Sequence, residues 1–485
     1  MSDQRTLEDE NQDASYEDAV QPALFVEHSP TDSDLSEDVV LSDEAIESIL
    51  TALDDSRDED VHAFLLELSL ADRADLLSKI GAEDRSFLID RFPDIFVADV
   101  FSWLSEDLAR QTLQSLPAAR VAAMLSTLES DDAVKLIDDL SPSFQKQILL
   151  KLSAADRQAV EEGLTYPDDS AGRLMSREFV AIPRFWTVGK TIDYMREAHE
   201  ELPDDFTTVF VIDPMYHVVG EIPLNRILRS KRATKIEDLT LGENHPVPAD
   251  ADQEDVALMF SRDGLTSAPV VDDVGRIIGV ITIDDVVEVI EDEAQEDILR
   301  LAGVSGDSDL HRALLPTTLS RFWWLAINLA TAFIASGVVG MFEATLSQVV
   351  ALAVLMPIVA GMGGNAGTQT LTVAVRALAT KELSRTNAVR TVIKETAVGF
   401  LNGFAFAIIT GAIAAYWFDS EMLGIVIGLA MIINLVAAGL FGIMIPLVLE
   451  RIKVDPALAS AVFLTTVTDV VGFFTFLGLA SWLML

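Results

Sequence analysis

Long apolar runs occupy the last third of this chain of 485 residues. Five of them are each long enough to cross roughly 30 Å of hydrocarbon as a helix. They lie at about 322–342, 346–375, 396–418, 423–449 and 458–483. The pattern therefore predicts an all-α domain of five transmembrane helices over residues 315–485.

A different pattern fills residues 61–168, where helix-start signals recur roughly every twelve residues. They are Ser69, Gly81, Pro93, Ser105, Pro117, Ser130, Ser141 and Ser153. Apolar positions at helical spacing lie between these signals, as in Leu76, Leu77 and Ile80. The regular spacing predicts stacked helical hairpins, which form a solenoid-like α-helical domain.

The pattern changes again over residues 169–290, where β-rich runs alternate with amphipathic helical stretches. The runs TTVFVID (207–213) and SAPVVDDVGRIIGVIT (267–282) predict strands, with a hairpin turn at 272–275. The segments HVVGEIPLNRIL (217–228) and RIIGVITIDDVVEVI (276–290) resemble paired CBS modules. This resemblance implies a tandem α/β regulatory domain. An acidic helix at 288–301 then leads into a linker, so that residues 291–314 connect this domain to the membrane.

The charge of the chain is confined to its first part. Lys and Arg number 34 against 77 Asp and Glu, a net charge of −43, yet residues 313–485 hold 8 basic and 8 acidic side chains. The acidic part should repel nucleic acid and attract divalent cations. Residues 1–60 are polar and acidic without a signal peptide, and predict a disordered tail. The lack of cysteine excludes disulfides and thiolate metal sites.

Seven Lys and Arg residues mark one side of the apolar segments, whereas the turns on the opposite side carry none. They are Arg376, Lys381, Arg385, Arg390, Lys394, Arg451 and Lys453. By the positive-inside rule, residues 1–321 and both basic connections lie in the cytoplasm and the C-terminus lies outside. We therefore expect a multi-pass protein of the cytoplasmic (inner) cell membrane.

Asp469 is the only ionisable residue deep within any of the five apolar segments. It stands about 16 Å from the expected cytoplasmic end of its helix, at ~1.5 Å per residue. A charged side chain at that depth costs at least about 2.5 kcal/mol, so it normally faces a bundle interior or a water-filled path. We interpret Asp469 as part of a cation path; a protonated carboxyl that only packs is the alternative.

The second apolar segment contains PIVAGMGGNAGTQT, with Pro357, four glycines and the polar residues Asn365, Thr368 and Gln369. Glycines can free backbone carbonyls, and irregular backbone is tolerated in a membrane only where protein or water surrounds it. Helix packing through small residues is the alternative, and both can hold. Carboxylate, amide, hydroxyl and backbone oxygens suit a hard cation. Magnesium needs few protein ligands, while calcium, manganese, sodium and protons stay open on chemistry alone.

Four motifs make residues 62–485 resemble the MgtE family of magnesium channels and transporters. They are YPDDSAGRLM (166–175), GVITIDDVVEVIEDEAQEDILRLAGV (279–304), GMGGNAGTQT (361–370) and DPALASAVFLTTVTDVVGFF (455–474). The resemblance implies a homodimer in membrane lipid with a pore at the subunit interface. In that pore Asp469 would coordinate hydrated Mg²⁺, with Gly361 and Asn365 nearby on the second span.

The resemblance also implies that Mg²⁺ bound between the helical domain, the CBS modules and the connecting helix locks the channel shut. The candidate regulatory ligands are Asp252, Glu254, Asp285, Glu293, Glu296, Asp297, Asp131 and Asp132. The charge balance favours this mechanism independently, because crowded carboxylates repel one another until divalent cations bridge them. High cytoplasmic magnesium would then favour the compact state.

Thr282 and Asp285 stand at the T-x-x-D spacing of nucleotide-binding CBS modules, so ATP is a further candidate ligand. The chain has no Walker motif and no cytoplasmic pairing of a nucleophile with a base, so we do not expect an enzyme. We predict a magnesium channel or facilitator gated by cytoplasmic magnesium. The competing hypotheses are a secondary transporter, in which Asp469 relays protons or sodium, and a non-transporting magnesium sensor.

Overall fold

The computed structural model describes residues 41–485 except 199–201, 204, 241–243, 305–311 and 385. Most of the predicted tail, part of the predicted linker and Arg385 of the basic connection therefore lie outside the described residues. The chain divides into two compact units, residues 1–120 and 121–485. Each unit is described by itself.

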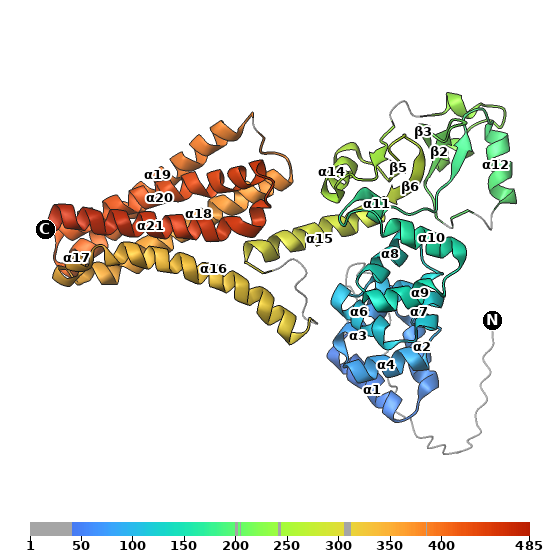
Figure 1. The fold of residues 1–485 in the computed structure, drawn as a ribbon, viewed down its shortest axis with the longest axis horizontal. Helices are drawn as coiled ribbons and strands as arrows, with labels where there is room; N and C mark the ends of the chain where they lie inside the picture. Colours follow the sequence, from blue (N-terminus) through green and yellow to red (C-terminus); the bar gives the residue numbers. More distant parts are fainter. Residues whose placement is uncertain (1–40, 199–201, 204, 241–243, 305–311, 385) are drawn as a thin grey trace, which may run out of the picture. The chain divides into compact units, whose positions relative to one another are not determined.

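Six helices lie in the described part of the first unit (Figure 1). They are α1 (Asp43–Asp54), α2 (Asp58–Glu67), α3 (Leu70–Lys79), α4 (Ala82–Arg91), α5 (Ala98–Ser102) and α6 (Glu106–Ser115). Several predicted start signals are confirmed. Ser69 caps α3 in a capping box with Asp72, and Gly81 and Ser105 are the N-caps of α4 and α6.

Two predictions fail in this unit. Helix α1 lies within the segment predicted as a disordered tail, because Ile46, Ile49 and Leu53 recur at helical spacing and are buried despite their acidic neighbours. Pro93 opens no helix; the chain turns after α4, and α5 begins only at Ala98. The tail prediction is therefore wrong for residues 41–60.

Five further helices lead to the first sheet. They are α7 (Ala118–Leu125), α8 (Ser130–Asp138), α9 (Pro142–Leu149), α10 (Ala154–Gly163) and α11 (Ala171–Leu174). Ser141 and Ser153 are the N-caps of α9 and α10, as predicted. The N-cap of α8 is Glu129, one residue before the predicted Ser130. Glu129 therefore has an extended backbone, with φ of −62° and ψ of 159°, just before α8.

Two three-stranded sheets of the same topology confirm the tandem α/β prediction (Figure 1). They comprise β1 (Ala181–Pro183), β2 (Thr208–Ile212) and β3 (Val218–Pro223), then β4 (Val247–Pro248), β5 (Ser267–Val271) and β6 (Ile277–Thr282). In each sheet the first strand runs parallel to the second, and the second antiparallel to the third. The helices of the two modules are α12 (Val188–Glu197), α13 (Leu224–Leu228) and α14 (Gln253–Asp263), with a short 3-10 helix η1 (Ile236–Asp238).

The predicted hairpin turn at 272–275 joins β5 to β6. The Asp272 Oδ1 atom accepts hydrogen bonds from the backbone N–H groups of Val274 and Arg276 at 3.0 and 2.9 Å. Gly275 has φ of 86°, a conformation that glycine adopts without steric cost. Helix α15 (Ile283–Leu301) follows β6 directly and carries the predicted acidic stretch.

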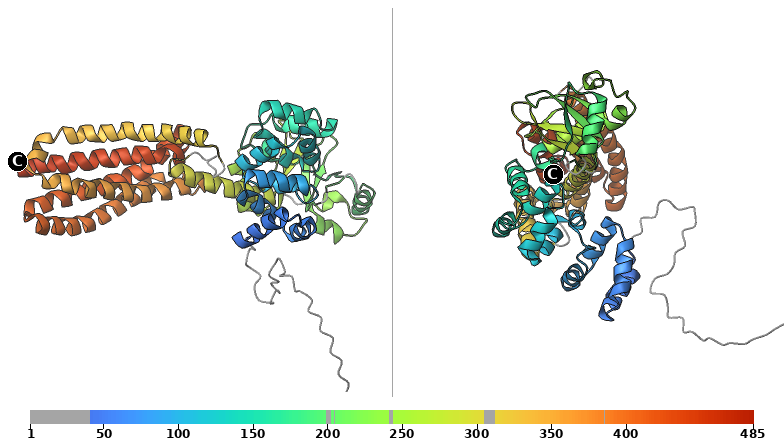
Figure 2. Two further views of the ribbon diagram at one scale, coloured as in Figure 1. Left: turned by 90° about the horizontal axis from the view of Figure 1, so that it is seen from below. Right: turned by 90° about the vertical axis from the view of Figure 1, so that its right-hand side faces the viewer.

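Among the described residues, five helices are long and apolar enough to cross a membrane. They are α16 (Leu314–Gly340), α18 (Ala351–Ala379), α19 (Ala388–Phe418), α20 (Glu421–Arg451) and α21 (Pro456–Met484). The left view of Figure 2 shows these helices lying alongside one another. The predicted second span is too long at its start, because a separate short helix, α17 (Glu343–Gln348), precedes α18. The basic connection is shorter than predicted, since Arg376 still lies in α18.

Candidate functional site

The glycine-rich motif lies within one continuous helix. Helix α18 runs from Ala351 to Ala379 with Pro357 inside it, so the expected irregular backbone is absent from this described segment. Its glycines allow close packing instead. A Cβ atom on Gly363 would stand 2.2 Å from Nδ2 of Asn434, and one on Gly367 would stand 3.1 Å from Leu464. Small-residue packing is the alternative that the structure favours for this face.

The opposite face of α18 is polar and open. Gly361, Asn365, Thr368 and Gln369 are exposed in the single chain, although they lie in the middle of a membrane-length helix. An amide or hydroxyl facing lipid without a partner is unfavourable. Protein or water must therefore cover this polar face when the helix stands in a membrane.

Asp469 lies on α21, the helix that packs directly against α18. Its side chain is half-buried and has no hydrogen bond or ion pair with any residue that the structure describes. A carboxylate left unpaired within a membrane-length helix is available to an ion from a water-filled path. The structure thus puts the predicted pore residues Gly361, Asn365 and Asp469 on two packed helices.

Asn434 is a buried polar residue of the bundle that the sequence reasoning missed. It is 0% exposed on α20, and its Nδ2 atom donates a hydrogen bond of 2.9 Å to the Val359 carbonyl of α18. Gly363 of α18 and Gly472 of α21 make room for its side chain. Asn434 therefore bonds α20 to α18 and lies close to α21. A lone amide within the apolar run 423–449 was the available signal.

The start of α8 and the second CBS module share a group of carboxylates, here called the α8 cluster. Oxygen atoms of Glu129, Asp131 and Glu178 all lie within 4.8 Å of one another, close enough to hold a metal ion. Asp132 and Asp285 are close enough to act on the charge of Asp131. The predicted ligands Asp131, Asp132 and Asp285 therefore come together. Glu129 and Glu178 were missed, because only tertiary folding brings residue 178 to α8.

Hydrogen bonds from neighbouring groups hold the Glu178 carboxylate of the α8 cluster in place. Its Oε2 atom accepts from the hydroxyls of Ser130 and Ser176, each at 2.8 Å, and from the backbone N–H of Arg177 at 3.0 Å. By contrast, Oδ1 of Asp131 is buried without a hydrogen-bond partner among the described residues. An unpaired buried oxygen beside other carboxylates is suited to a cation.

The pKa values of the α8 cluster report the same crowding. Burial, and next the charge of Asp285, raise the pKa of Asp131 well above its usual range. Burial raises the pKa of Asp285 to about 6, against the lowering effect of its hydrogen bonds with Thr282. Glu129 also has a raised pKa through burial. The native arrangement thus disfavours the charged carboxylates unless a cation accompanies them.

A second group, here called the α14 cluster, joins α14 to the middle of α15. Burial, and next the charge of Glu293, raise the pKa of Glu254 to about 7, and Asp252 and Asp297 act in the same direction. Gln253 donates a hydrogen bond of 2.7 Å to Oε1 of Glu293. Four of the predicted regulatory residues therefore lie within electrostatic reach of one another.

Glu296 lies near the C-terminal end of α15. Its carboxylate forms an ion pair with Arg300 one turn along α15. Arg300 also donates a hydrogen bond of 2.5 Å to Asp455, the N-cap of α21. The Arg300–Asp455 contact links the C-terminal end of α15 to α21, the helix that carries Asp469.

The predicted nucleotide pair has a structural role. The Oδ2 atom of Asp285 accepts hydrogen bonds from the backbone N–H and the hydroxyl of Thr282 at 3.1 and 2.6 Å, a capping box for α15. A nucleotide held by these two side chains would have to share or replace those bonds.

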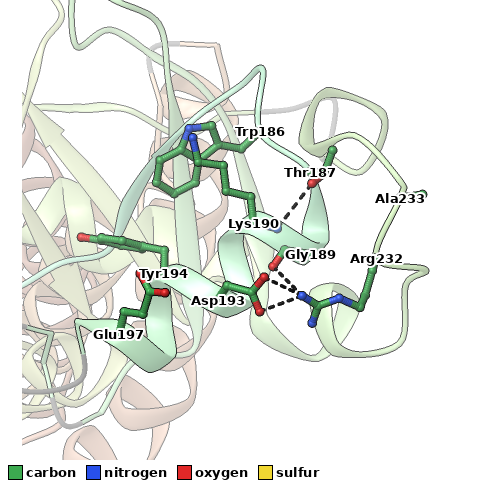
Figure 3. A pocket seen from close by; sticks show the side chains of 9 residues that line it. All are labelled: Trp186, Thr187, Gly189, Lys190, Asp193, Tyr194, Glu197, Arg232 and Ala233. Carbon is green, nitrogen blue, oxygen red and sulfur yellow. Dashed lines mark hydrogen bonds and ion pairs between the residues drawn. The ribbon is translucent and has the colours of Figure 1, made fainter.

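The two cavities of the CBS region differ in their chemistry. One, of about 750 Å³, lies on the first module, and Figure 3 shows Arg232 bonded to Asp193 across it. Arg232 holds Asp193 through two hydrogen bonds of 2.6 and 2.7 Å, and the Lys190 ammonium lies 4.5 Å from the ring centre of Trp186. The other, of about 900 Å³, lies between the modules and is lined by several unpaired polar groups.

Comparison with protein families gives three matches along the chain. A family described as a divalent cation transporter matches residues 356–479, the MgtE intracellular N domain matches residues 68–169, and the CBS domain matches residues 237–292. The last match covers the second module, whose sheet the first module repeats.

Two relatives cover nearly the whole chain. The magnesium transporter MgtE of Thermus thermophilus is 31% identical over 445 residues, 90% of this chain and 98% of the relative. That of Bacillus subtilis is 27% identical over 439 residues, 90% of this chain and 97% of the relative. A crystal structure of the cytosolic domain of the Mg²⁺ channel MgtE in complex with ATP is 27% identical, with a TM-score of 0.47, covering 50% of this chain and 99% of that one.

Proposed function

We propose a function from one premise, that this chain belongs to the MgtE family of divalent cation transporters. The protein conducts Mg²⁺ across the membrane along the electrochemical gradient, and cytoplasmic Mg²⁺ closes it. It has no enzymatic activity. Residues 1–321 lie in the cytoplasm of a cell whose inner membrane holds the five spans, and the C-terminus lies outside.

The polar face of α18 is the observation that carries the transport proposal. Its exposed amides and hydroxyl would face lipid in a single chain, and Asp469 on the neighbouring helix has no partner among the described residues. A second copy that covers this face would enclose water and oxygen ligands between the two chains. The function therefore rests on a homodimer with the ion path at its interface.

A single engineered cysteine tests the dimer cleanly, because the chain has no native cysteine. Thr368→Cys on the polar face should form a disulfide-linked dimer in native membranes on mild oxidation. Phe404→Cys, on an exposed apolar face of α19, is the matched control and should stay monomeric. Cross-linking of the control alone would contradict the interface.

Transport is tested by ion uptake into liposomes. Wild type should accumulate Mg²⁺ down a gradient without an opposing ion, and Asp469→Asn should not. Asp419→Asn, which changes a carboxyl at the end of α19, should transport like wild type. Uptake that strictly requires a proton or sodium gradient would favour coupled transport, and no uptake by well-expressed wild type would favour a sensor.

We propose that the α8 and α14 clusters are the regulatory Mg²⁺ sites. Their raised pKa values show that the compact arrangement opposes carboxylate charge, and bound Mg²⁺ would remove that penalty. Neutralising Glu293, Glu296 and Asp297 together should leave the channel open at high magnesium. Glu291→Gln, an exposed acid on the same helix, is the control. Unchanged inhibition in the triple variant would refute the assignment.

ATP binding through Thr282 and Asp285 stays a prediction of this proposal. The two side chains already bond to each other, so nucleotide binding there would alter the cap of α15. Titrating ATP against wild type and Thr282→Val tests it. Equal affinity for both proteins would exclude this pair.

A further inference from the structure

A second contact joins the CBS region to the membrane bundle, apart from the one at the end of α15. The ammonium of Lys381 donates a hydrogen bond to Oδ1 of Asp255, and the two side chains form an ion pair. Asp255 lies in the first turn of α14, and Lys381 lies two residues beyond the end of α18. The pair therefore links the second CBS module directly to the helix that carries Gly361 and Asn365.

On the bundle side, the turn that carries Lys381 is anchored to two membrane helices. The Leu383 side chain is 6% exposed and packs with Ala374 of α18 and Ile443 of α20. The Leu383 backbone N–H also donates a hydrogen bond of 2.7 Å to the Ala377 carbonyl of α18. A displacement of Lys381 therefore moves the end of α18, because the turn between them is fixed by packing and hydrogen bonding.

On the cytoplasmic side, Asp255 moves with the α14 cluster. Glu254, a member of that cluster, directly precedes Asp255 in the first turn of α14. The buried face of the same helix packs against α15, since Val256 and Phe260 share one core with Val286. The ion pair is therefore attached to the helix whose carboxylates we propose as ligands of regulatory Mg²⁺.

The backbone of Lys381 also sets this residue apart. Its φ is 53°, in the left-handed region that residues with a side chain seldom adopt and glycine adopts at no steric cost. The turn alone thus gives no reason for a lysine. Lys453 follows α20 in the same way, with φ of 58°, but forms no ion pair with any residue that the structure describes. The two lysines differ in their partner, so Lys453 is a matched control.

We propose that Lys381 and Asp255 form a latch that holds the second CBS module to the end of α18 in the closed state. This inference rests on the proposed function, in which Mg²⁺ favours the arrangement with gathered carboxylates. Both side chains of the latch are 56% exposed, so the pair adds little to the stability of the fold. A conformational equilibrium near balance still responds to a contact that is present in only one of its states. The latch reaches the ion path through α18, separately from the contact of α15 with α21.

A double-mutant cycle on ion uptake into liposomes tests the latch. Lys381→Asn removes the charge and keeps a residue that tolerates the left-handed backbone. It should raise the magnesium concentration that halves uptake about two- to fivefold, the range expected for an exposed ion pair. Asp255→Asn should have the same effect, and the double variant should go no further than either single one. Lys453→Asn should behave like wild type. Additive shifts in the double variant, or an equal shift in Lys453→Asn, would overturn the proposal.

Cross-linking tests the contact without any measurement of transport, because the chain has no native cysteine. Asp255→Cys with Lys381→Cys, treated in native membranes with a short bifunctional maleimide, should give a linked peptide that mass spectrometry detects. Magnesium should raise its yield, and Asp255→Cys with Lys453→Cys should give none. Absence of the linked peptide at high magnesium, or a yield that magnesium does not change, would overturn the latch. A protein that cross-links in this way but does not transport would contradict the proposed function and leave the latch standing.

Discussion

The proposed ion path in the membrane bundle and the proposed regulatory sites of the α8 and α14 clusters arrange their carboxylates in opposite ways. In the bundle, the Asp469 side chain forms no hydrogen bond or ion pair with any residue that the structure describes. In the α14 cluster, burial and the charge of neighbouring carboxylates raise the pKa of Glu254 to about 7. Conduction needs an ion to bind and leave easily, whereas sensing needs binding that changes a conformational equilibrium. One isolated carboxylate suits the first task, and several crowded ones suit the second.

The largest effect is expected from removing the isolated charge. Asp469→Ala should reduce magnesium uptake to less than about a tenth of wild type, because no other carboxylate in the spans can replace it. Uptake of several divalent cations by variant and wild type, at matched expression, measures the loss. Near-normal uptake would show that Asp469 only packs within the bundle.

Removing crowded charges should act on the metal response instead. Asp131→Asn combined with Asp285→Asn relieves repulsion, so the double variant should melt at a higher temperature than wild type without magnesium. Wild type should gain about 2.7 kcal/mol at a magnesium concentration of about 100 times its Kd, and the double variant should lose most of that gain. Thermal melting with and without magnesium compares them. An equal magnesium response in both would exclude the α8 cluster.

The crowded acids also predict a pH dependence of the free energy of unfolding. Their pKa values are raised on folding, Asp285 to about 6 and Glu254 to about 7, so the folded state holds more protons than the unfolded state. Without magnesium, this stability is full below about pH 4 and is lost as the pH rises through about 7. Magnesium should flatten the decline near neutral pH. Melting temperatures between pH 5 and 8, with chelator and with magnesium, check the slope.

A smaller effect is expected from the buried amide that holds the bundle. Asn434→Ala removes one hydrogen bond to the Val359 carbonyl and should cost about 1 kcal/mol, a usual value for interhelical bonds in membranes. Melting in detergent measures the loss, and Asn402→Ala on an exposed face of α19 is the control. A larger loss in the control would contradict the role given to Asn434.

The smallest expected effect is the difference between substitutions of two acids on α15, Glu296 and Glu293. Glu296 is neutralised by Arg300, so Glu296→Gln should move the magnesium threshold by at most about 1 kcal/mol. Glu293, next to Glu254, should have a larger effect when changed to Gln. The magnesium concentration that halves uptake, measured for both variants, ranks them. The reverse order would show that Glu296 is a ligand.

The helices of the membrane domain could be predicted because apolar length is a local property. Clusters that depend on tertiary contact could not. The α8 cluster was predicted in part, since Asp131 and Asp285 belong to recognisable motifs, whereas Glu178 reaches α8 only through the turn before β1. The same limit applies to Asn434, whose partners lie on two other helices.

Amino-acid composition gave a wrong structural prediction for two segments, α1 and α18. An acidic stretch predicted disorder where α1 forms, because three aliphatic side chains on one face outweigh the acids on the other. The glycines predicted a broken backbone, but α18 is continuous. The helix loses little stability, because neighbouring side chains fill the space beside its glycines. In both segments, packing against residues distant in the sequence decided whether a continuous helix forms.

The contact between Arg300 and Asp455 makes α15 and α21 a mechanical linkage. Asp455 caps the helix on which Asp469 stands fourteen residues later, about 21 Å along its axis at ~1.5 Å per residue. No loop intervenes, so rotation imposed at the cap turns the carboxylate by the same angle. Inserting one residue between Asp455 and Asp469 would rotate Asp469 by about 100° about the axis of α21. This would uncouple the movement of α15 at Asp455 from the direction of the Asp469 carboxylate, while both ends of α21 keep their own structure.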